Sequence, residues 1–532
     1  MFLSRLNPKQ IVWLERLFLA VVVGAYLCLA LVKVKYPGIY ASEITHAPAI
    51  FGLPNAPALV KLGNFPVLVM AYYGAVKVYV GWLFFKVLGV SVLTIRLPWI
   101  VCAAGGLVAL YYGLRKYTNR TIAAVTLLLL VLDPTFVSQT KLDSGPVALE
   151  FLIKASVLGL WATLLKRAEP RRALRLLLPI WLLLALGEYN KLNFLWFVNS
   201  FYAAAVLVYW RSWLGWYKTG AKKIRLGLTA FFAGYLALVG YFFLIQEKFH
   251  ILEYSDNAFN LRDRLEIIFD QFKHHVEGTI FYNFALGTLD EPWLPWLFWG
   301  VLGLTGLGLA VIAVNARLRK SLGRQTIFVT LIVLSTLAQI VATKSAKAPW
   351  HLFALFPFFT ILTATGLYAI AQLFRQKMRW VVLGLLLLGF VSAGVRLQAR
   401  YLDAYDDPPK NIHWSAAIYD VLDYTKASQA KVICVDWGTY TPLAVLDPIK
   451  GKYLNYVWYF RREEPERYAD TARRYLDPKK GYLFVLQDHE RAYFKEAQDK
   501  FYASLKASGY TLEPVLTAGQ GPVPDFTVYR TK

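Results

Sequence analysis

Carboxylates that could accept a proton are scarce in the first part of this chain. Before Phe151 the acidic residues are only Glu15, Glu43, Asp133, Asp143 and Glu150. Glu150 precedes Lys154 by four residues, which predicts a simple ion pair on one helix face. Glu43, Asp133 and Asp143 remain as candidates for general-base or substrate-orienting chemistry.

Two of these three acids also have a plainer explanation. Glu43 could be a solvated loop carboxylate, and Asp143, just before an apolar run, could cap a helix. Asp133 precedes Pro134 inside an apolar run, where an ionisable group is costly and indicates function by default. Three acids in otherwise acid-poor sequence favour a site. His46 is the other possible base near Glu43.

Lys77, Lys191 and Lys347 form a second group of candidates because they lie near the same ends of the apolar runs as these acids. Lysines at such ends often extend to the membrane interface without any further role. A lipid phosphate or pyrophosphate bound at this face would also explain them, since ammonium groups form charge-assisted hydrogen bonds with phosphate.

The elements that must position these residues are membrane spans. The chain has 532 residues, of which 57% are hydrophobic and 17% charged, and its mean hydropathy is +0.42. A helix needs about 20 apolar residues to cross a bilayer. Eleven spans are predicted to begin near Ile11, Leu97, Thr121, Pro146, Ala173, Leu192, Leu226, Trp293, Thr326, His351 and Trp380.

The chain has a net charge of +24, and the distribution of its basic residues predicts how it is oriented in the membrane. Basic residues concentrate in alternate short loops, as the positive-inside rule requires of a cytoplasmic N-terminus. This distribution differs from the basic face of a nucleic-acid-binding protein, so nucleic acid is excluded as a partner. The chain is predicted to be a multi-pass protein of the inner (plasma) membrane, with its C-terminal part extracytoplasmic.

Residues 1–398 are predicted to form the transmembrane domain, and 399–532 a small extracytoplasmic α/β domain. Residues 34–96 form the first outer loop, in which the apolar segment 66–88 is predicted to be an interfacial helix. A further outer loop covers 247–291. The tail shows strand-like runs at 431–435, 482–487 and 526–529, and helix-like runs at 414–427 and 490–508.

These residues together resemble the GT-C glycosyltransferase superfamily, particularly the protein O-mannosyltransferases and the lipid A aminoarabinose transferases. The resemblance covers about the first 200 residues and the region 344–375. Its matching positions are Glu43 in the first outer loop, the Gly-x₆-Arg-Leu-Pro segment 89–98 that contains Arg96, Asp143 with Gly145 and Pro146, Lys191, and Lys347 with Trp350, His351 and Pro357. The Asp-Glu pair of the family's first loop is here reduced to Glu43 alone.

The resemblance implies an inverting hexosyl- or pentosyltransferase of the cell envelope, similar to mannosyltransferases. The donor would be a polyprenyl-phosphate-linked sugar, and the acceptor a hydroxyl of a glycan, lipid or protein. Glu43 would be the catalytic base, and Asp143 would orient the acceptor or the lysines. The implied substrate-binding residues are Arg96, Lys191, Lys347 and His351, and the positions of Lys77 and Asp133 add these two residues to the predicted binding site.

No cofactor follows from the sequence, and a divalent cation bound by Asp143 stays an open alternative. The His274-His275-x-Glu277 segment is predicted to lie in an amphipathic loop helix and not to bind a metal. Two other functions compete with glycosyl transfer. One is a lipid or solute transporter or flippase, although the chain lacks the paired, interrupted halves of many transporters. The other is a non-catalytic membrane scaffold with an outer sensing domain.

Overall fold

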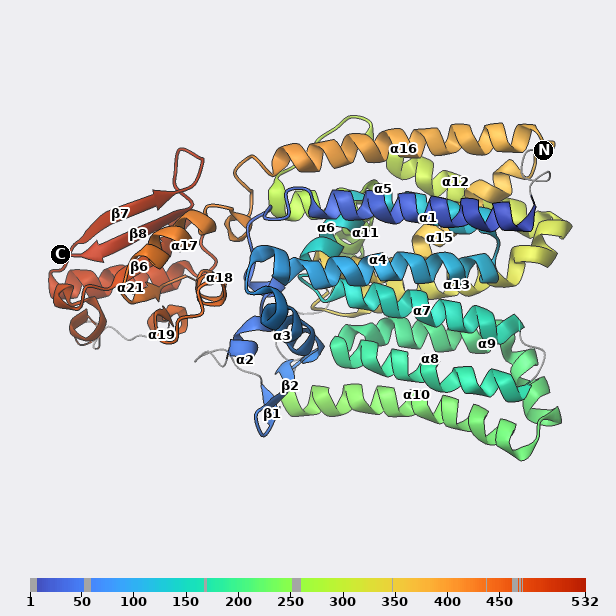
Figure 1. The fold of residues 1–532 in the computed structure, drawn as a ribbon, viewed down its shortest axis with the longest axis horizontal. Helices are drawn as coiled ribbons and strands as arrows, with labels where there is room; N and C mark the ends of the chain where they lie inside the picture. Colours follow the sequence, from blue (N-terminus) through green and yellow to red (C-terminus); the bar gives the residue numbers. More distant parts are fainter. Residues whose placement is uncertain are drawn as a thin grey trace.

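The computed structural model describes residues 7–51, 59–166, 170–250, 260–346, 348–436, 438–461, 467, 470 and 472–532. Lys347 therefore lies outside the described residues. The described chain forms a bundle of long helices joined at one end to a mixed α/β domain (Figure 1). We refer to the bundle end that faces this domain as the tail end; the chain begins at the opposite end.

Eight helices of the described chain are long and apolar enough to cross a membrane. They are α1 (Pro8–Leu31), α4 (Val92–Tyr117), α7 (Val147–Lys166), α9 (Leu195–Thr219), α10 (Lys222–Phe249), α12 (Leu294–Val314), α13 (Ala316–Ala342) and α16 (Met378–Ala404). Two bent pairs raise the number to ten if each pair is one span. These pairs are α5 (Arg120–Leu132) with α6 (Pro134–Leu142), bent by 70°, and Pro349–Leu355 with α15 (Phe358–Ala371), bent by 48°.

The eleventh expected span, near Ala173, corresponds to α8 (Pro170–Asn190), which packs beside α7 and α10 but is not among these ten. Every expected segment is thus helical, and the predicted polytopic helical fold is confirmed. Within the part of the chain that the structure describes, length and composition support eight to ten spans, so the count of eleven stays a prediction.

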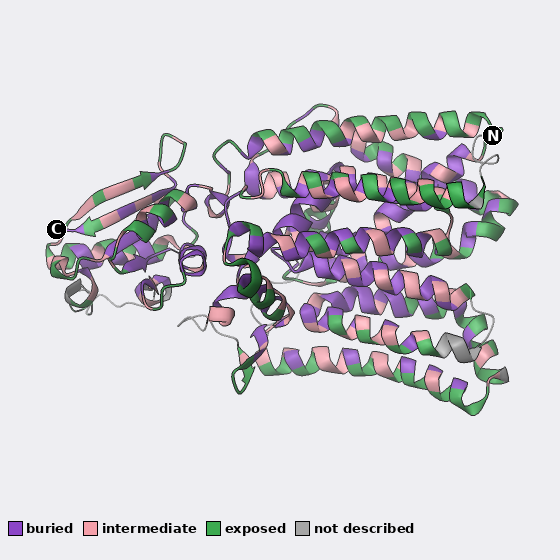
Figure 2. Ribbon diagram, in the orientation of Figure 1, coloured by how far each residue is buried: buried purple, intermediate pink, exposed green. Residues whose placement is uncertain are grey.

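The outer surface of the bundle is apolar, as lipid contact requires. Figure 2 shows exposed faces along α1, α10 and α16, around an interior that is mostly buried. The exposed residues on α16 include Val381, Leu385, Leu388 and Val395. Exposed apolar faces of this extent are rare on soluble monomers. The structure therefore agrees with a bundle embedded in a bilayer.

Close packing of α12 against α15 depends on two glycines. A Cβ atom added to Gly308 would lie 2.2 Å from the Cα atom of Gly366. We expect Gly308→Ala to separate the helices and lower the free energy of unfolding by about 1–3 kcal/mol, the usual cost of overpacking. Gly303→Ala is the matched control, since no atom lies within 4 Å of its added Cβ. Equal melting temperatures for the two variants would contradict this prediction.

The first loop combines short helices with a three-stranded antiparallel sheet at the tail end. Its elements are η2 (Ala41–Glu43), α2 (Ala47–Phe51), β1 (Val60–Leu62), β2 (Phe65–Met70), β3 (Tyr73–Gly74) and α3 (Val76–Leu88). The expected interfacial helix over 66–88 is therefore wrong in its first half. Gly63, at φ +59°, turns the chain between β1 and β2, and the β-branched Val67 and Val69 favour the strand.

The second long loop contains α11 (Leu261–Glu277), followed by the π-helical turn η5 (Tyr282–Leu286). This confirms the amphipathic helix predicted around His274 and His275. Gly278 ends α11 in the left-handed conformation at φ +77°, where a side chain would be strained.

The tail folds as the predicted small α/β domain. Its five-stranded sheet has the order β5-β4-β6-β8-β7, with β4 parallel to β5 and β6 and the other neighbours antiparallel. The strands are β4 (Val432–Cys434), β5 (Tyr453–Asn455), β6 (Leu483–Gln487), β7 (Leu512–Ala518) and β8 (Phe526–Thr531), and the helices include α17 (Ile418–Ala427), α18 (Tyr440–Leu446), α19 (Val457–Arg461) and α21 (Lys495–Ser508).

The tail domain shares a hydrophobic core with the first loop. Ile44, Phe85 and Ile95 from the loop side cluster with Val421 and Val528 of the domain. The helix α16 continues to Ala404, six residues beyond the expected boundary at 398. The domain is therefore seated on the first loop, next to the acids and lysines identified in the sequence (Figure 1).

Candidate functional site

Five separate segments bring charged side chains together at the tail end of the bundle. Glu43 ends η2, Lys77 lies in the first turn of α3, and Arg96 in the second turn of α4. Asp143 stands in the turn between α6 and α7. Lys191 follows α8 and forms a β-bridge with Tyr73. We call Glu43, Lys77, Asp143 and Lys191 the charged cluster, and Arg96 its anchor.

Arg96 holds Glu43 in a bidentate ion pair. Its Nε donates to Oε2 and its Nη2 to Oε1, both at 2.9 Å, and neither side chain is exposed. The backbone N–H of Tyr40 also donates to Oε1, at 3.1 Å. Burial raises the pKa of Glu43, while Arg96 acts to lower it.

Arg96 also fastens the start of the first loop. Its Nη1 donates to the carbonyls of Val34 at 2.6 Å and Tyr36 at 3.3 Å, and its Nη2 to that of Pro37 at 3.0 Å. A guanidinium has five N–H donors, and five hydrogen bonds occupy them here. A phosphate could therefore bind Arg96 only in place of one of these hydrogen bonds, and its role in phosphate binding stays a prediction.

Lys77 and Asp143 form a second buried ion pair. Lys77 Nζ lies 2.8 Å from Asp143 Oδ2 and donates to the carbonyls of Asp143 at 2.8 Å and Glu43 at 3.4 Å. It also lies 4.8 Å from the ring centre of Trp99, a cation–π contact. Burial raises the pKa of Asp143 and Lys77 acts to lower it. Lys77 thus joins the two acids of the cluster.

Asp143 also performs the capping role considered for it. Its Oδ1 accepts from the backbone N–H of Ala148 at 2.8 Å, in the first turn of α7. Asp143 itself has a left-handed backbone, with φ 50° and ψ 35°, which Asp tolerates better than most residues. Asp143 therefore both caps α7 and forms the ion pair with Lys77.

Lys191 is the cation of the cluster with spare donors. Its Nζ donates to the carbonyl of Gly145 at 2.9 Å and lies 5.7 Å from the ring centre of Tyr73. An ammonium has three N–H groups, so this one hydrogen bond leaves capacity for a ligand. Burial lowers the pKa of Lys191 to about 8, against the raising effect of Glu150 and Asp143.

Gly145 is required by the packing around Lys191. A Cβ atom at this position would lie 2.7 Å from the Cβ of Trp350 and 3.0 Å from Lys191 Nζ. His351 follows Trp350, and its Nδ1 accepts from the backbone N–H of Ala348 at 3.1 Å. His351 therefore lies near the cluster, and its predicted role in substrate binding stays a prediction.

His46 shares a small cavity with the cluster. The cavity, of about 10 Å³, is lined by Ser42, Thr45, His46, Val69, Tyr73, Gly74, Lys77, Pro146 and Asn190. That is room for about one water molecule. Burial, with the nearby charge of Lys77, lowers the pKa of His46 well below its usual value. His46 is therefore neutral at physiological pH, as a base must be.

One predicted residue lies elsewhere, and one residue was missed. Asp133 lines a different cavity, between α5, α11, α15 and α16. Glu150 forms no ion pair with Lys154, because Lys154 Nζ donates instead to the carbonyl of Ala354 at 3.1 Å. Glu150 Oε1 is buried without a hydrogen bond, and its charge acts on Lys191. Lys347 lies outside the described residues.

The described residues hold no group of three or more His, Cys, Asp or Glu side chains placed to bind a metal. The donor set around Asp143 consists of one carboxylate, two lysines and backbone carbonyls. Two neighbouring ammonium groups do not fit a divalent cation at this position, so no step of the chemistry is derived through one.

Neither a protein-family model nor a curated protein sequence matches the chain. Its structure is similar to the crystal structure of ArnT from Cupriavidus metallidurans bound to undecaprenyl phosphate, with a TM-score of 0.60, 12% identity and 98% coverage of both chains. It is also similar to the oligosaccharyltransferase AglB from Archaeoglobus fulgidus in complex with an inhibitory peptide and a dolichol-phosphate. That TM-score is 0.51 at 11% identity, with 94% of this chain and 71% of that chain covered. The chain has the GT-C fold.

Proposed function

We propose that this protein is a GT-C glycosyltransferase that moves a sugar from a polyprenyl-phosphate-linked donor to an acceptor hydroxyl. One observation carries the proposal: the fold brings two carboxylates and two lysines from four segments into one buried cluster at the tail end. The fold relatives that contain undecaprenyl phosphate or dolichol-phosphate support a lipid-phosphate donor. The fold alone would not decide the function, because one fold hosts many activities.

In the proposed reaction, the acceptor hydroxyl attacks the anomeric carbon and its proton passes to Glu43. The bond between that carbon and the phosphate oxygen breaks, and the phosphate leaves with the bonding electrons. A carboxylate offers about four lone-pair sites, and three donors occupy three of them here. The remaining site on Oε2 would receive the proton.

Asp143 would position Lys77 between the two acids, and Lys191 would bind the leaving phosphate. Fixed cationic donors stabilise charge that develops in the transition state. The cavity beside the cluster has room for about one water, so the first loop must move before a sugar can bind.

We place residues 1–398 in the catalytic domain and 399–532 in an extracytoplasmic domain that contacts the acceptor. The cluster, the first loop and the tail domain all lie at the end of the bundle opposite the start of the chain (Figure 1). The basic loop residues Arg115, Lys116 and Arg120 lie at the other end, as a cytoplasmic N-terminus requires. A C-terminal reporter that is active only in the cytoplasm would overturn this topology.

The function can be tested directly with purified protein in liposomes. The protein is incubated with polyprenyl-phosphate sugars and a panel of glycan, lipid and peptide acceptors, and released polyprenyl phosphate is measured. We expect release only in the presence of a productive acceptor. Movement of the intact donor between leaflets without release would instead establish a flippase.

Lys191→Met is expected to weaken donor binding about 10- to 100-fold, because a charge-assisted hydrogen bond to phosphate is worth roughly 1.5–3 kcal/mol. Methionine keeps most of the apolar stem. Lys344→Met is the matched control, since Lys344 is exposed in the turn that follows α13, at the same end of the bundle. Binding is measured with a fluorescent polyprenyl phosphate. Equal affinities in both variants would remove Lys191 from the phosphate site.

The same contact should depend on pH. The pKa of Lys191 in the free protein is lowered to about 8, so the ammonium is present below that pH and lost above it. The donor phosphodiester keeps its single charge throughout this range. Donor affinity is therefore expected to be constant up to about pH 8 and then to fall about tenfold per pH unit. In Lys191→Met this break in the affinity profile should disappear.

A further inference from the structure

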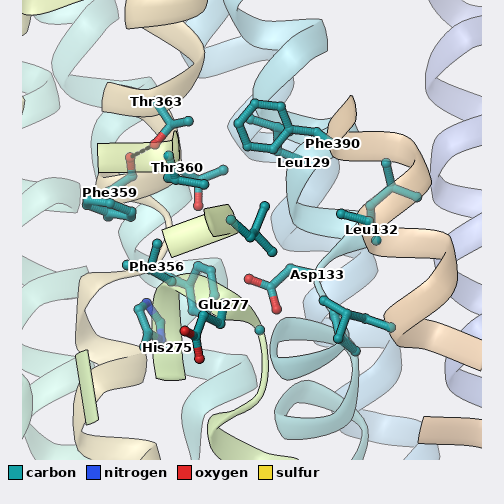
Figure 3. Close-up of a pocket in the computed structure, with 18 residues that line it drawn as sticks. Leu129, Leu132, Asp133, His275, Glu277, Phe356, Phe359, Thr360, Thr363 and Phe390 are labelled. Carbon is teal, nitrogen blue, oxygen red and sulfur yellow. Dashed lines mark hydrogen bonds between the residues drawn. The ribbon is translucent and has the colours of Figure 1, made fainter. Parts of the chain in front are cut away.

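A second cavity lies apart from the charged cluster, where α5 meets α6. Its volume is about 90 Å³, and it is lined by residues of α5, α11, α12, α15 and α16. Most of its wall is apolar, with Phe356, Phe359 and Leu397 among the lining residues. Figure 3 shows Asp133, His275 and Glu277 among the side chains that line this cavity. The bend of 70° at Asp133 is what brings its carboxylate there.

Two polar atoms of the residues that line this cavity have no hydrogen-bond partner. Glu277 Oε1 and His275 Nδ1 are fully buried and have no hydrogen-bond partner, and each residue is only 2% exposed. The other Glu277 oxygen contacts His274 Nδ1 at 3.1 Å and Thr279 Oγ1 at 3.3 Å. Leaving a buried polar atom unpaired costs about 1–3 kcal/mol. Both residues line the cavity, and two unpaired polar atoms in its wall indicate a ligand that forms hydrogen bonds there.

The charge in the cavity is also unbalanced. Within the described part of the chain, neither Asp133 nor Glu277 forms an ion pair with a lysine or arginine; the ionic neighbour of Glu277 is His274. Asp133 Oδ1 accepts only from the backbone N–H groups of Thr135 and Phe136, at 2.8 and 3.3 Å. Burial lowers the pKa of His275 to about 3, so its ring is neutral and one nitrogen can accept. A cation with several N–H groups would satisfy all three side chains.

The ligand chemistry that fits is an ammonium group and not a metal ion. Among the residues that the structure describes, these three side chains do not form a metal-ligating group. One water molecule needs about 10–15 Å³ of cavity volume. The cavity of about 90 Å³ therefore admits a group of several heavy atoms. The lining residues of α12, α15 and α16 belong to helices or bent pairs that are long and apolar enough to cross a membrane, so the cavity is bordered by candidate spans.

We propose that this cavity binds the primary ammonium group of a membrane amphiphile, the chemistry of an aminophospholipid headgroup. Asp133, Glu277 and His275 each accept one of its three N–H groups, and the apolar walls receive the adjoining carbon chain. None of these residues belongs to the charged cluster, so this site stands or falls independently of the proposed glycosyl transfer.

The test compares phosphatidylethanolamine with phosphatidylcholine, whose quaternary ammonium has no N–H donor. The full-length protein is reconstituted in nanodiscs that contain both lipids and released into mild detergent. Native mass spectrometry then measures the lipid retained per protein. We expect one phosphatidylethanolamine to be retained at least tenfold more often than phosphatidylcholine. Equal retention of the two lipids would overturn the proposal.

Substitutions of the cavity residues test whether phosphatidylethanolamine binds in this cavity. Glu277→Gln and Asp133→Asn should each abolish the preference, and asparagine keeps the helix-capping acceptor of Asp133. Glu266→Gln, on the exposed side of α11, is the matched control and should keep the preference. Retention that is unchanged in both cavity variants would overturn the proposal, even if one variant folds poorly.

A soluble amine distinguishes the two sources of an ammonium group. Ethanolamine is added to the protein in phosphatidylcholine nanodiscs, and the melting temperature is followed. A rise in wild type but not in Glu277→Gln would support the ammonium site and show that a free amine suffices. A parallel sample contains phosphatidylethanolamine in the nanodisc in place of the added ethanolamine. A rise in melting temperature in that sample alone would support the site and assign it to a lipid. No rise with either amine would overturn it.

Discussion

Glu43→Gln is expected to lower turnover by about 10²–10⁴-fold, the usual scale for losing a general base. A sugar-acceptor hydroxyl is a poor nucleophile, so removing its proton in the transition state matters. Glutamine keeps the size of the side chain but cannot take the proton. Turnover is measured per folded protein, as the rate of polyprenyl phosphate release at saturating donor and acceptor.

The same substitution is also expected to destabilise the fold. Glu43 is buried against Arg96, and breaking a buried pair by removing one partner costs about 3–5 kcal/mol. A double variant, Glu43→Gln with Arg96→Met, removes both charges and should recover part of that loss, because the carbonyls of the first loop that Arg96 binds also lose their donor. We expect it to recover stability without recovering turnover. Recovery of both would show that Glu43 serves only to anchor the first loop through Arg96.

His46 is the rival base. It is buried and neutral, and it lines the cavity beside Lys77. His46→Ala should retain turnover within about tenfold of wild type if Glu43 takes the proton. An inactive His46→Ala together with an active Glu43→Gln would transfer the role to His46.

The helical segments were predictable from the sequence because hydropathy is a local property. All eleven expected segments are helices, and α17, α21, β4, β6 and β8 fall within or next to the runs predicted in the tail. The strand β2 was not predictable in the same way. Its apolar run continues into α3, and only the turn at Gly63 and the pairing with β1 distinguish it from a helix.

The members of the candidate site were largely predictable, but their pairing was not. Glu43 and Arg96 are 53 residues apart, and Lys77 and Asp143 are 66 apart, so only tertiary packing joins them. The sequence placed Asp133 in the same site as Asp143, although the bend between α5 and α6 leaves Asp133 in a separate cavity. The spacing of Glu150 and Lys154 in the sequence predicted an ion pair between them. In the structure Lys154 instead donates to the carbonyl of Ala354, at the bend before α15.

Lys77→Met is expected to lower the free energy of unfolding by about 3–5 kcal/mol, because it leaves the carboxylate of Asp143 buried without its cation. The side chains of Lys77 and Asp143 are 8% and 0% exposed, so water cannot replace the lost charge. Lys61→Met, on the exposed strand β1 of the same loop, is the control and should change stability by less than about 0.5 kcal/mol.

Adding Asp143→Asn to Lys77→Met should restore most of the lost stability. Asparagine can still accept from Ala148 N–H and tolerates the left-handed backbone at this position, so the change removes the charge and little else. Turnover should stay at least about 10²-fold below wild type in the double variant, if the pair positions the reacting groups. A double variant that is as unstable as Lys77→Met would show that the lysine stabilises the fold through Trp99 and the two carbonyls and not through Asp143. A double variant with restored stability and restored turnover would remove this ion pair from the catalytic site, because both of its charges would then be dispensable.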